Sequence, residues 1–242
     1  GIWDEPFLGY MGEELDRLEQ PFMSTVFTVS SHHPFNVPVE YADPLPAGPH
    51  KIHKTIAYTD VAIRRFFEDN AGKEWFRNSV FVFTADHVSS GRVAPETNTT
   101  LGSYRIVMFM YSPGGELKGE YSEPVMQTDI MPTLLGLMGN DEPYFAFGRD
   151  VFNEPGRPAV VYNYSTRGLV FVIANDDYMV QFDEKEIKTV YARSDVFNEH
   201  PLPKPYPEES IRLNEYLKAV IQQYYSHIEQ KLYTVPPPGD EH

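Results

Sequence analysis

The first half of the chain alternates between apolar residues at helical spacing and short continuous apolar runs. Residues 51–69 show the clearest helical spacing, and an apolar stripe of this kind predicts an amphipathic helix. Asp60 falls within the same stripe, and a lone acid on an apolar helix face is typical of a buried, hydrogen-bonded structural group. The stripe itself consists of Ile52, Ile56, Ile63 and Phe67.

Three apolar segments rich in β-branched and aromatic residues predict buried strands. They cover Ser24–Val29, residues 78–87 and residues 104–113. The second segment is apolar without interruption, which suits a sheet that is covered on both faces. A helix is expected at 9–20, and residues 123–139 are expected to form a loop and then a helix that Asp129 caps. This succession predicts an α/β fold with a mainly parallel sheet flanked by helices.

The pattern changes after about residue 155, where short strands separated by turns predict a small antiparallel sheet. We therefore divide the chain into an α/β core (1–155), a small antiparallel β subdomain (156–200) and a carboxyl-terminal region (201–242). The last region comprises a proline-rich linker, an amphipathic helix at 208–232 and a tail. The apolar stripe of this helix contains Leu213, Leu217, Val220, Ile221, Tyr224, Ile228 and Leu232.

Composition narrows the range of functions. The formal net charge of −15 over 242 residues repels nucleic acid, so we expect no nucleic-acid partner. An anionic substrate would need local positive charge, for which a bound cation is the obvious source. The chain has no cysteine, which excludes disulfides, thiolate metal sites and cysteine nucleophiles. No apolar run approaches the roughly 18–20 residues that a membrane-spanning helix needs.

Polar side chains follow two of the predicted strands at their carboxyl ends. Asp86 and His87 end the second strand, and residues 30–33 follow the first. In open parallel sheets, ligands bind beyond the carboxyl ends of the strands. A carboxylate oxygen and an imidazole nitrogen suit a divalent ion such as Mn²⁺, Mg²⁺ or Zn²⁺. The alternative is that Asp86 caps a helix or opens a turn, and both interpretations stay open at this point.

The histidines of the first loop also have two interpretations. His32 and His33 precede a proline, where histidine is commonly a solvated surface residue. Alternatively, one of them donates a hydrogen bond or a proton to an anionic oxygen. The chain has no Gly-x-Ser-x-Gly elbow, no Walker-type phosphate loop and no evident carboxylate pair. The residues alone therefore support half of a metal site and no complete active centre.

An ordered series of short motifs resembles the sulfatase branch of the alkaline phosphatase superfamily. Within that branch, it is most similar to the lipoteichoic acid synthase-like phosphoglycerol transferases. The resemblance covers roughly residues 1–155, with weaker similarity to about residue 195. The motifs are TVFTVSSHHPFNVP (25–38), IAYTD (56–60), FVFTADH (81–87), MFMYSPGG (108–115), QTDIMPTLLGLMG (127–139) and FGRDVF (147–152).

The resemblance implies roles for several residues and a cofactor. Asp86 and His87 would ligate a divalent metal ion, with Mn²⁺ expected first and Mg²⁺, Zn²⁺ or Ca²⁺ as alternatives. His32 would contact the phosphate or sulfate group of the substrate, and His33 fills a variable position and is the weaker candidate. The segment from Asp129 to Thr133 would be structural.

The resemblance also implies what lies outside the chain. The nucleophile of such enzymes, together with an acidic metal ligand, lies far upstream, and neither motif is found here. We therefore expect the carboxyl-terminal half of an enzyme that has no catalytic residue of its own and is inactive in isolation. Its expected partners are the amino-terminal half of the same protein and an anionic lipid or a sulfate or phosphate ester.

The expected location and the rival functions complete these expectations. The enzyme would lie outside the cytoplasmic membrane, in the periplasm or on the outer face, held by upstream transmembrane helices. Alternative functions are an arylsulfatase- or phosphatase-type hydrolase and a non-catalytic binding domain that retains the fold. A homodimer formed through exposed sheet edges is a further expectation.

Overall fold

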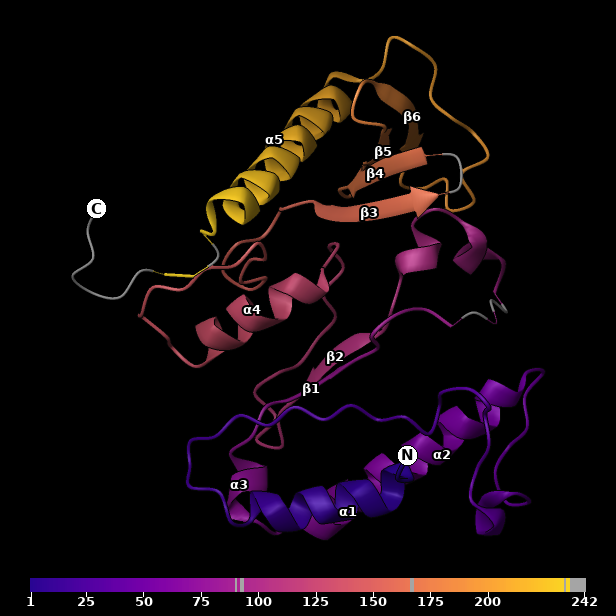
Figure 1. Ribbon diagram of the computed structural model, residues 1–242, viewed down its shortest axis with the longest axis vertical. Coiled ribbons are helices and arrows are strands. Elements are labelled where there is room, and N and C mark those ends of the chain that lie inside the picture. The colour runs from indigo at the N-terminus through magenta and orange to yellow at the C-terminus, as the bar shows by residue number, and fades with distance from the viewer. Residues whose placement is uncertain (90, 92–93, 166–167, 233, 236–242) are drawn as a thin grey trace. The chain divides into compact units, whose positions relative to one another are not determined.

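The chain divides into two compact units in the computed structural model (Figure 1). The first unit comprises Gly1–Val93 and Arg105–Gly119, and the second comprises Ala94–Tyr104 and Glu120–His242. The structure describes residues 1–89, 91, 94–165, 168–232 and 234–235. The predicted tail therefore lies almost entirely outside the described residues, and the predicted division into three regions stays a prediction.

The first unit is built on three helices, α1 (Asp4–Leu15), α2 (Lys51–Asn70) and α3 (Glu74–Arg77). Figure 1 shows α1 running alongside α2, and an aromatic core fills the space around them. The indole Nε1–H of Trp75 donates to the Asp16 carboxylate at 2.6 Å, which satisfies the one polar atom of this buried ring. The buried core residues are Leu8, Leu15, Ala62, Phe66, Trp75 and Phe76.

Helix α2 begins and ends almost where the sequence predicts, but it buries a neighbouring face. Ile56 of the predicted stripe is exposed. The expectation that Asp60 is buried is wrong, because its side chain is exposed and its Oδ2 lies 3.5 Å from Arg64 Nη2. The large rings of Tyr58 and Phe66 decide which face turns inward, because they contribute most of the apolar area. The buried residues of α2 are Thr55, Tyr58, Ala62, Phe66 and Asn70.

The strands of the first unit pair differently from the prediction. Strand β1 (Phe81–Thr84) pairs with β2 (Met108–Tyr111) in antiparallel orientation, with Phe83 stacked on Phe109 at a centroid distance of 4.7 Å. Residues 24–29 are not part of a strand. The described residues therefore contain no parallel strand pair, contrary to the expected mainly parallel sheet. An apolar run identifies an extended segment but does not specify its hydrogen-bonded neighbour, so the pairing direction could not be predicted.

The second unit contains the small antiparallel sheet and the carboxyl-terminal helix that the sequence predicts. Strands β3 (Ala159–Ser165), β4 (Gly168–Ala174), β5 (Tyr178–Phe182) and β6 (Ile187–Ala192) follow one another in order, each antiparallel to the next. Helix α5 (Glu208–Gln230) lies beside the sheet in Figure 1 and packs against it. The buried core residues are Phe171, Ile173, Val180, Phe182, Val190, Leu213 and Leu217.

Only the amino-terminal half of the α5 stripe is covered by the sheet. Leu213 and Leu217 are buried, whereas Tyr224, Ile228 and Leu232 are exposed. Near the end of the helix, His227 stacks on Phe145 and Tyr224 contacts Phe147, with centroid distances of 5.1 and 5.3 Å. The remaining short helices are η1 (Val39–Tyr41), η2 (Pro95–Asn98), η3 (Gly102–Tyr104) and η4 (Gln127–Asp129).

Helix α4 (Ile130–Leu137) follows η4 and ends near Gly139, whose φ of 69° favours glycine. Asp129 is completely buried, but its side chain does not cap α4. Instead, its two oxygens accept the backbone N–H groups of Met126 (2.8 Å) and Arg149 (2.9 Å). Thr133 adds a hydrogen bond from the backbone N–H of Val151 at 3.1 Å. Both polar residues of the Asp-x-x-Pro-Thr segment thus hold the 149–151 backbone.

Candidate metal pair and substrate loop

Asp86 and His87 lie in a bend directly after β1. The backbone N–H of Ala85 still pairs with Val107 at 3.2 Å, and the chain then turns. Side chains of consecutive residues on a straight strand point to opposite sides. The bend instead brings Asp86 Oδ2 within 3.3 Å of His87 Nε2. No helix follows within residues 85–89, so the helix-cap interpretation of Asp86 is wrong, whereas the turn and metal interpretations stay.

The hydrogen bonds of this pair determine which ring nitrogen of His87 could bind a metal. His87 Nδ1 lies 2.8 Å from the carbonyl oxygen of Val88. Because a carbonyl can only accept, Nδ1 must carry the proton, and Nε2 of the neutral ring keeps its lone pair. Metal-bound histidines commonly donate their other N–H to a backbone carbonyl in this way. The side chains are 51% exposed for Asp86 and 74% for His87, so an ion could reach them.

Asp86 and His87 are ligands of a suitable kind for a divalent ion, but two ligands are too few to form a complete metal site. A hard carboxylate oxygen and a borderline imidazole nitrogen are suitable ligands for Mn²⁺ or Zn²⁺. Metal sites of either kind use at least three or four protein ligands or waters. Among the described residues, however, no group of three or more His, Cys, Asp or Glu side chains could hold a metal ion. Asp86 and His87 can therefore be two ligands of a larger set, and the predicted histidines of the first loop do not extend that set.

His32 and His33 lie in the loop that follows residue 29, and their rings make different contacts. His32 Nδ1 lies 3.0 Å from the carbonyl oxygen of His33, which again assigns the proton of the neutral ring to Nδ1. The ring of His33 meets the ring of Phe35 edge to face at a centroid distance of 5.7 Å. Both histidines are exposed. Their geometry is compatible with contact to an anion and with the solvated-surface interpretation.

A basic cavity of about 530 Å³ adjoins this loop. Residues 35–37 line one part of it, and His50, Lys51 and Lys54 from the start of α2 line another. Its described lining contains no carboxylate, which contrasts with the formal charge of −15 for the whole chain. Such a lining attracts anions. Sequence reasoning did not single out these lysines, because two lysines at a helix start carry no specific signal.

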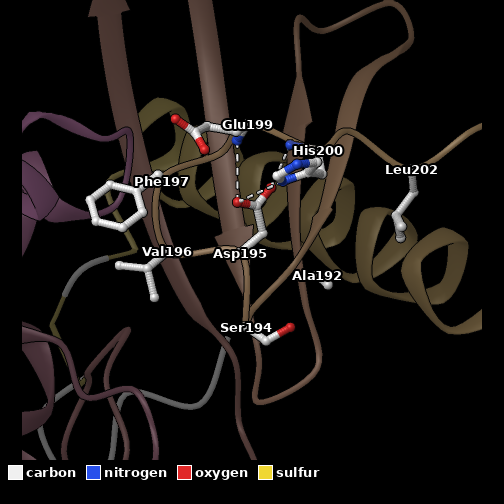
Figure 2. Close-up of a pocket in the computed structure, with 8 residues that line it drawn as sticks. All are labelled: Ala192, Ser194, Asp195, Val196, Phe197, Glu199, His200 and Leu202. Atoms are coloured by element: carbon white, nitrogen blue, oxygen red, sulfur yellow. Dashed lines mark hydrogen bonds and ion pairs between the residues drawn. The ribbon is translucent and has the colours of Figure 1, made fainter.

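A second cavity, of about 490 Å³, lies in the loop between β6 and α5 (Figure 2). Here Asp195 accepts the backbone N–H groups of His200 (2.8 Å) and Glu199 (3.2 Å), as the dashed lines in Figure 2 mark. The N–H of His200 is the main cause of the lowered pKa of the Asp195 carboxyl. The carboxylate therefore shapes its own loop, and His200 is an exposed residue at its end, which leaves the cavity without evident chemistry.

The fold has solved relatives. A protein of the alkaline phosphatase superfamily from Vibrio parahaemolyticus superimposes with a TM-score of 0.74 and 21% identity, covering 98% of this chain and 57% of that one. This likeness confirms the predicted alkaline phosphatase-like α/β fold, present in part. The described residues contain no helix that is long and apolar enough to cross a membrane.

Sequence comparison defines the family within that fold. The sulfatase family model matches residues 1–140, more than half of the chain, and the chain belongs to the sulfatase family. Lipoteichoic acid synthase 1 of Bacillus subtilis is 29% identical over 173 residues, which are 64% of this chain and 27% of that protein. Lipoteichoic acid synthase of Staphylococcus aureus is 25% identical over 173 residues, with coverages of 64% and 26%. The chain thus spans about a quarter of the length of these relatives.

Proposed function

We propose that this chain is part of a metal-dependent sulfatase-family enzyme that cleaves or transfers phosphoglycerol groups outside the cytoplasmic membrane. The observation that carries the proposal is the sulfatase match over residues 1–140, because that range includes both the Asp86–His87 pair and His32. The similarity to lipoteichoic acid synthases favours a phosphodiester over a sulfate ester as the bond that reacts. Mn²⁺ is the proposed ion, with Mg²⁺, Zn²⁺ and Ca²⁺ as alternatives.

Asp86 and His87 would hold the ion through a carboxylate oxygen and Nε2. The hydrogen bond from His87 Nδ1–H to Val88 keeps the ring in the tautomer that leaves Nε2 for the metal. When bound, the ion supplies positive charge that offsets the charge of the transferring group. This contribution matters in a chain of net charge −15, which otherwise repels an anionic substrate.

His32 would contact the substrate phosphate. In its protonated form, the ring donates from Nδ1 to the His33 carbonyl and from Nε2 to a phosphate oxygen. Lys51 and Lys54 in the adjoining cavity would add electrostatic attraction for the same anion. His33 is the weaker candidate for this contact, because its ring packs against Phe35.

The nucleophile and the remaining metal ligands would come from the amino-terminal half of the same protein, so the isolated chain is proposed to be inactive. The extended segment 22–29 exposes Met23, Phe27 and Val29, an apolar face that suits packing against that half. A second copy of the chain is the alternative partner for this face. Upstream transmembrane helices would anchor the enzyme.

The chain contains a matched pair of Asp–His sites with which to test the metal proposal. Titration of Mn²⁺ into the parent enzyme, which supplies the remaining ligands, followed by calorimetry or electron paramagnetic resonance, should detect binding that Asp86→Ala and His87→Ala each weaken by about tenfold or more. Asp195→Ala removes a carboxylate of the second unit that lies 3.8 Å from the ring of His200, outside the proposed metal pair, and should leave Mn²⁺ binding unchanged. Binding that is absent, or equally sensitive to Asp195→Ala, would favour a non-catalytic domain.

Turnover distinguishes the enzyme classes. The isolated chain should not hydrolyse a phosphodiester or a sulfate ester, and turnover that is lost in Asp86→Ala would contradict the proposed inactivity. In the parent enzyme, transfer of phosphoglycerol to an alcohol acceptor would support the transferase. Transfer to water alone would identify a phosphatase- or arylsulfatase-type hydrolase instead.

A further inference from the structure

A buried carboxylate in the first unit connects three segments at the base of the loop that carries His32. Asp4, the first residue of α1, is 1% exposed, and its Oδ1 accepts the backbone N–H groups of Val29 (3.1 Å) and Ser30 (3.0 Å). Its Oδ2 accepts the hydroxyl hydrogen of Thr59 on α2 at 2.7 Å. The backbone N–H of Asp4 donates in turn to Ser30 Oγ at 3.0 Å. Helix α1, helix α2 and the loop therefore meet at one side chain.

The hydrogen bonds continue from this carboxylate to the candidate substrate residue. The carbonyl oxygen of Val29 accepts the backbone N–H of His32 at 3.0 Å, and the carbonyl oxygen of His32 accepts that of Phe35 at 3.1 Å. Ser30 is buried, whereas His32 is exposed two residues later. The loop therefore has a fixed base and an accessible tip, and the position of its base depends on Asp4.

We propose that Asp4 is a positioning residue that sets the conformation of the His32 loop for substrate binding. The proposal rests on the proposed function in one respect, namely that His32 contacts the substrate phosphate. Asp4 itself, being buried, would act only through Val29 and Ser30.

The chemistry of the contact explains why a carboxylate stands at this position. Three donors from two segments converge on Asp4: the N–H groups of Val29 and Ser30 and the hydroxyl of Thr59. An ionised carboxylate accepts all three, and hydrogen bonds to a charged acceptor are stronger than those to a neutral one. Alanine would leave the three donors unsatisfied. Asparagine can keep both N–H contacts through its carbonyl oxygen, while its NH2 group faces Thr59, whose hydroxyl can then accept.

Amide hydrogen exchange of the intact 242-residue chain tests the proposal directly. In Asp4→Ala, the amides of Val29 and Ser30 should exchange about 10- to 100-fold faster, because each loses a hydrogen bond to a charged acceptor, and His32 should follow. Asp4→Asn should accelerate them less, by about threefold to tenfold, as expected of a conservative rescue. If Asp4→Ala does not fold, Asp4→Asn decides, and rates within about twofold of the unmodified protein would overturn the proposal.

Asp129 provides the matched control in the second unit. It is equally buried and also accepts two backbone N–H groups, those of Met126 and Arg149. Asp129→Asn should accelerate exchange at those two amides and leave the amides of Val29, Ser30 and His32 unchanged. Equal acceleration of the loop amides in Asp129→Asn would mean that they report overall stability, and the positioning role would be refuted.

Ligand binding separates this inference from the function on which it rests. Glycerol 1-phosphate should shift the ring signals of His32 in the unmodified chain, and Asp4→Asn should raise the apparent Kd by about threefold or more without moving signals of the second unit. If His32 does not respond in the unmodified chain, the proposed substrate contact fails while hydrogen exchange still decides the role of Asp4. If His32 responds and Asp4→Asn binds with an unchanged Kd, the positioning role fails and the substrate contact stands.

Discussion

The two units each bury a core and differ in what accompanies their exposed apolar residues. In the second unit, Ile173, Val180, Val190 and Leu217 are fully buried between the sheet and α5. In the first unit, the segment 22–29 leaves large apolar side chains exposed, and every candidate site residue is exposed as well. The second unit also leaves apolar residues exposed, among them Tyr224, Ile228 and Leu232 at the end of α5. The difference therefore lies in the chemistry: exposed apolar residues occur together with the exposed candidate site residues in the first unit, and this combination suits a surface that meets a further partner.

The two units are alike in their use of buried carboxylates. Asp4 in the first unit and Asp129 in the second each accept two backbone N–H groups, and at least one donor in each case, Val29 and Ser30 for Asp4 and Arg149 for Asp129, is distant in sequence. A buried acid in this chain therefore indicates a backbone support before it indicates catalysis. What differs is the supported segment, because only Asp4 holds the loop that ends in an exposed histidine.

The largest expected change in the free energy of unfolding concerns the core of the first unit, and substitution of two phenylalanines tests it. Phe66 is 6% exposed and contacts Phe67 and Trp75, whereas Phe27 is 66% exposed. Phe66→Ala should lower the free energy of unfolding by about 3–5 kcal/mol through lost burial and a residual cavity. Phe27→Ala should change it by less than about 0.5 kcal/mol. Denaturant unfolding measures both.

An equal cost for the two variants would contradict the contrast between core and uncovered surface. If Phe27→Ala proved as destabilising as Phe66→Ala, the segment 22–29 would be packed in solution, within the chain or against a second copy. Sedimentation at several concentrations would distinguish those two cases, because only self-association depends on concentration.

The second prediction concerns a close backbone approach in the second unit. A Cβ on Gly148 would lie 1.9 Å from the carbonyl oxygen of Thr128, next to Asp129. Gly148→Ala should destabilise this region by about 1–3 kcal/mol or more, because backbone atoms must move apart. Gly9→Ala is the control in the first unit: beyond its chain neighbours and the backbone of its own helix, no described atom lies within 4 Å of the added methyl, and alanine favours the helix by up to about 1 kcal/mol. Thermal unfolding that ranks the two variants in the opposite order would contradict the described packing around Asp129.

Local patterns predicted most of the elements, although residues 24–29 form no strand and α1 covers Asp4–Leu15 instead of 9–20, and they did not predict the tertiary pairing. The helical spacing at 51–69 corresponds to α2 at Lys51–Asn70, and the turn-separated strands after residue 155 form the antiparallel sheet. These features depend on residues close together in sequence. The antiparallel pairing of β1 with β2 depends instead on which distant segment lies beside each strand, and no local pattern contains that information.

In the candidate site, too, the sequence predicted what depends on neighbouring residues and missed what depends on tertiary contacts. The position of Asp86 and His87 after an apolar strand identified the pair, and the sulfatase motifs assigned it a proposed role. The supporting carboxylate was not found, because Asp4 meets Val29, Ser30 and Thr59 only in the folded chain. Asp60, the acid within the predicted apolar stripe of α2, was predicted to be buried and is exposed.

The third prediction concerns the loss of stability of the first unit at alkaline pH. Burial, with smaller contributions from Asp4 and Glu40, raises the pKa of the Tyr58 hydroxyl from 10.0 to about 12. Because the folded pKa is the higher one, the stabilising contribution is complete below about pH 10 and is lost as the pH rises through about 12. Tyr58→Phe should reduce this loss of stability, and the exposed Tyr10→Phe should not. Urea titrations over this pH range check the difference, and an unchanged slope in Tyr58→Phe would contradict it.

The smallest expected effect lies at the opposite end of the pH scale and in the second unit. In the turn between β5 and β6, Asp183 accepts the backbone N–H groups of Glu186 (2.9 Å) and Lys185 (3.1 Å), which together with Lys188 lower the pKa of its carboxyl from 3.8 to about 2. A lowered folded pKa means that the contribution is present above about pH 3.8 and is lost as the pH falls through about 2. Asp183→Asn should therefore flatten the acid limb of the stability curve slightly, whereas Asp176→Asn in the preceding turn removes the same charge without these contacts. If both variants flatten it equally, net charge and not the turn is responsible. If only Asp183→Asn does so, low pH destabilises the second unit through protonation of Asp183 in a surface turn. High pH, in contrast, destabilises the first unit through ionisation of the buried Tyr58.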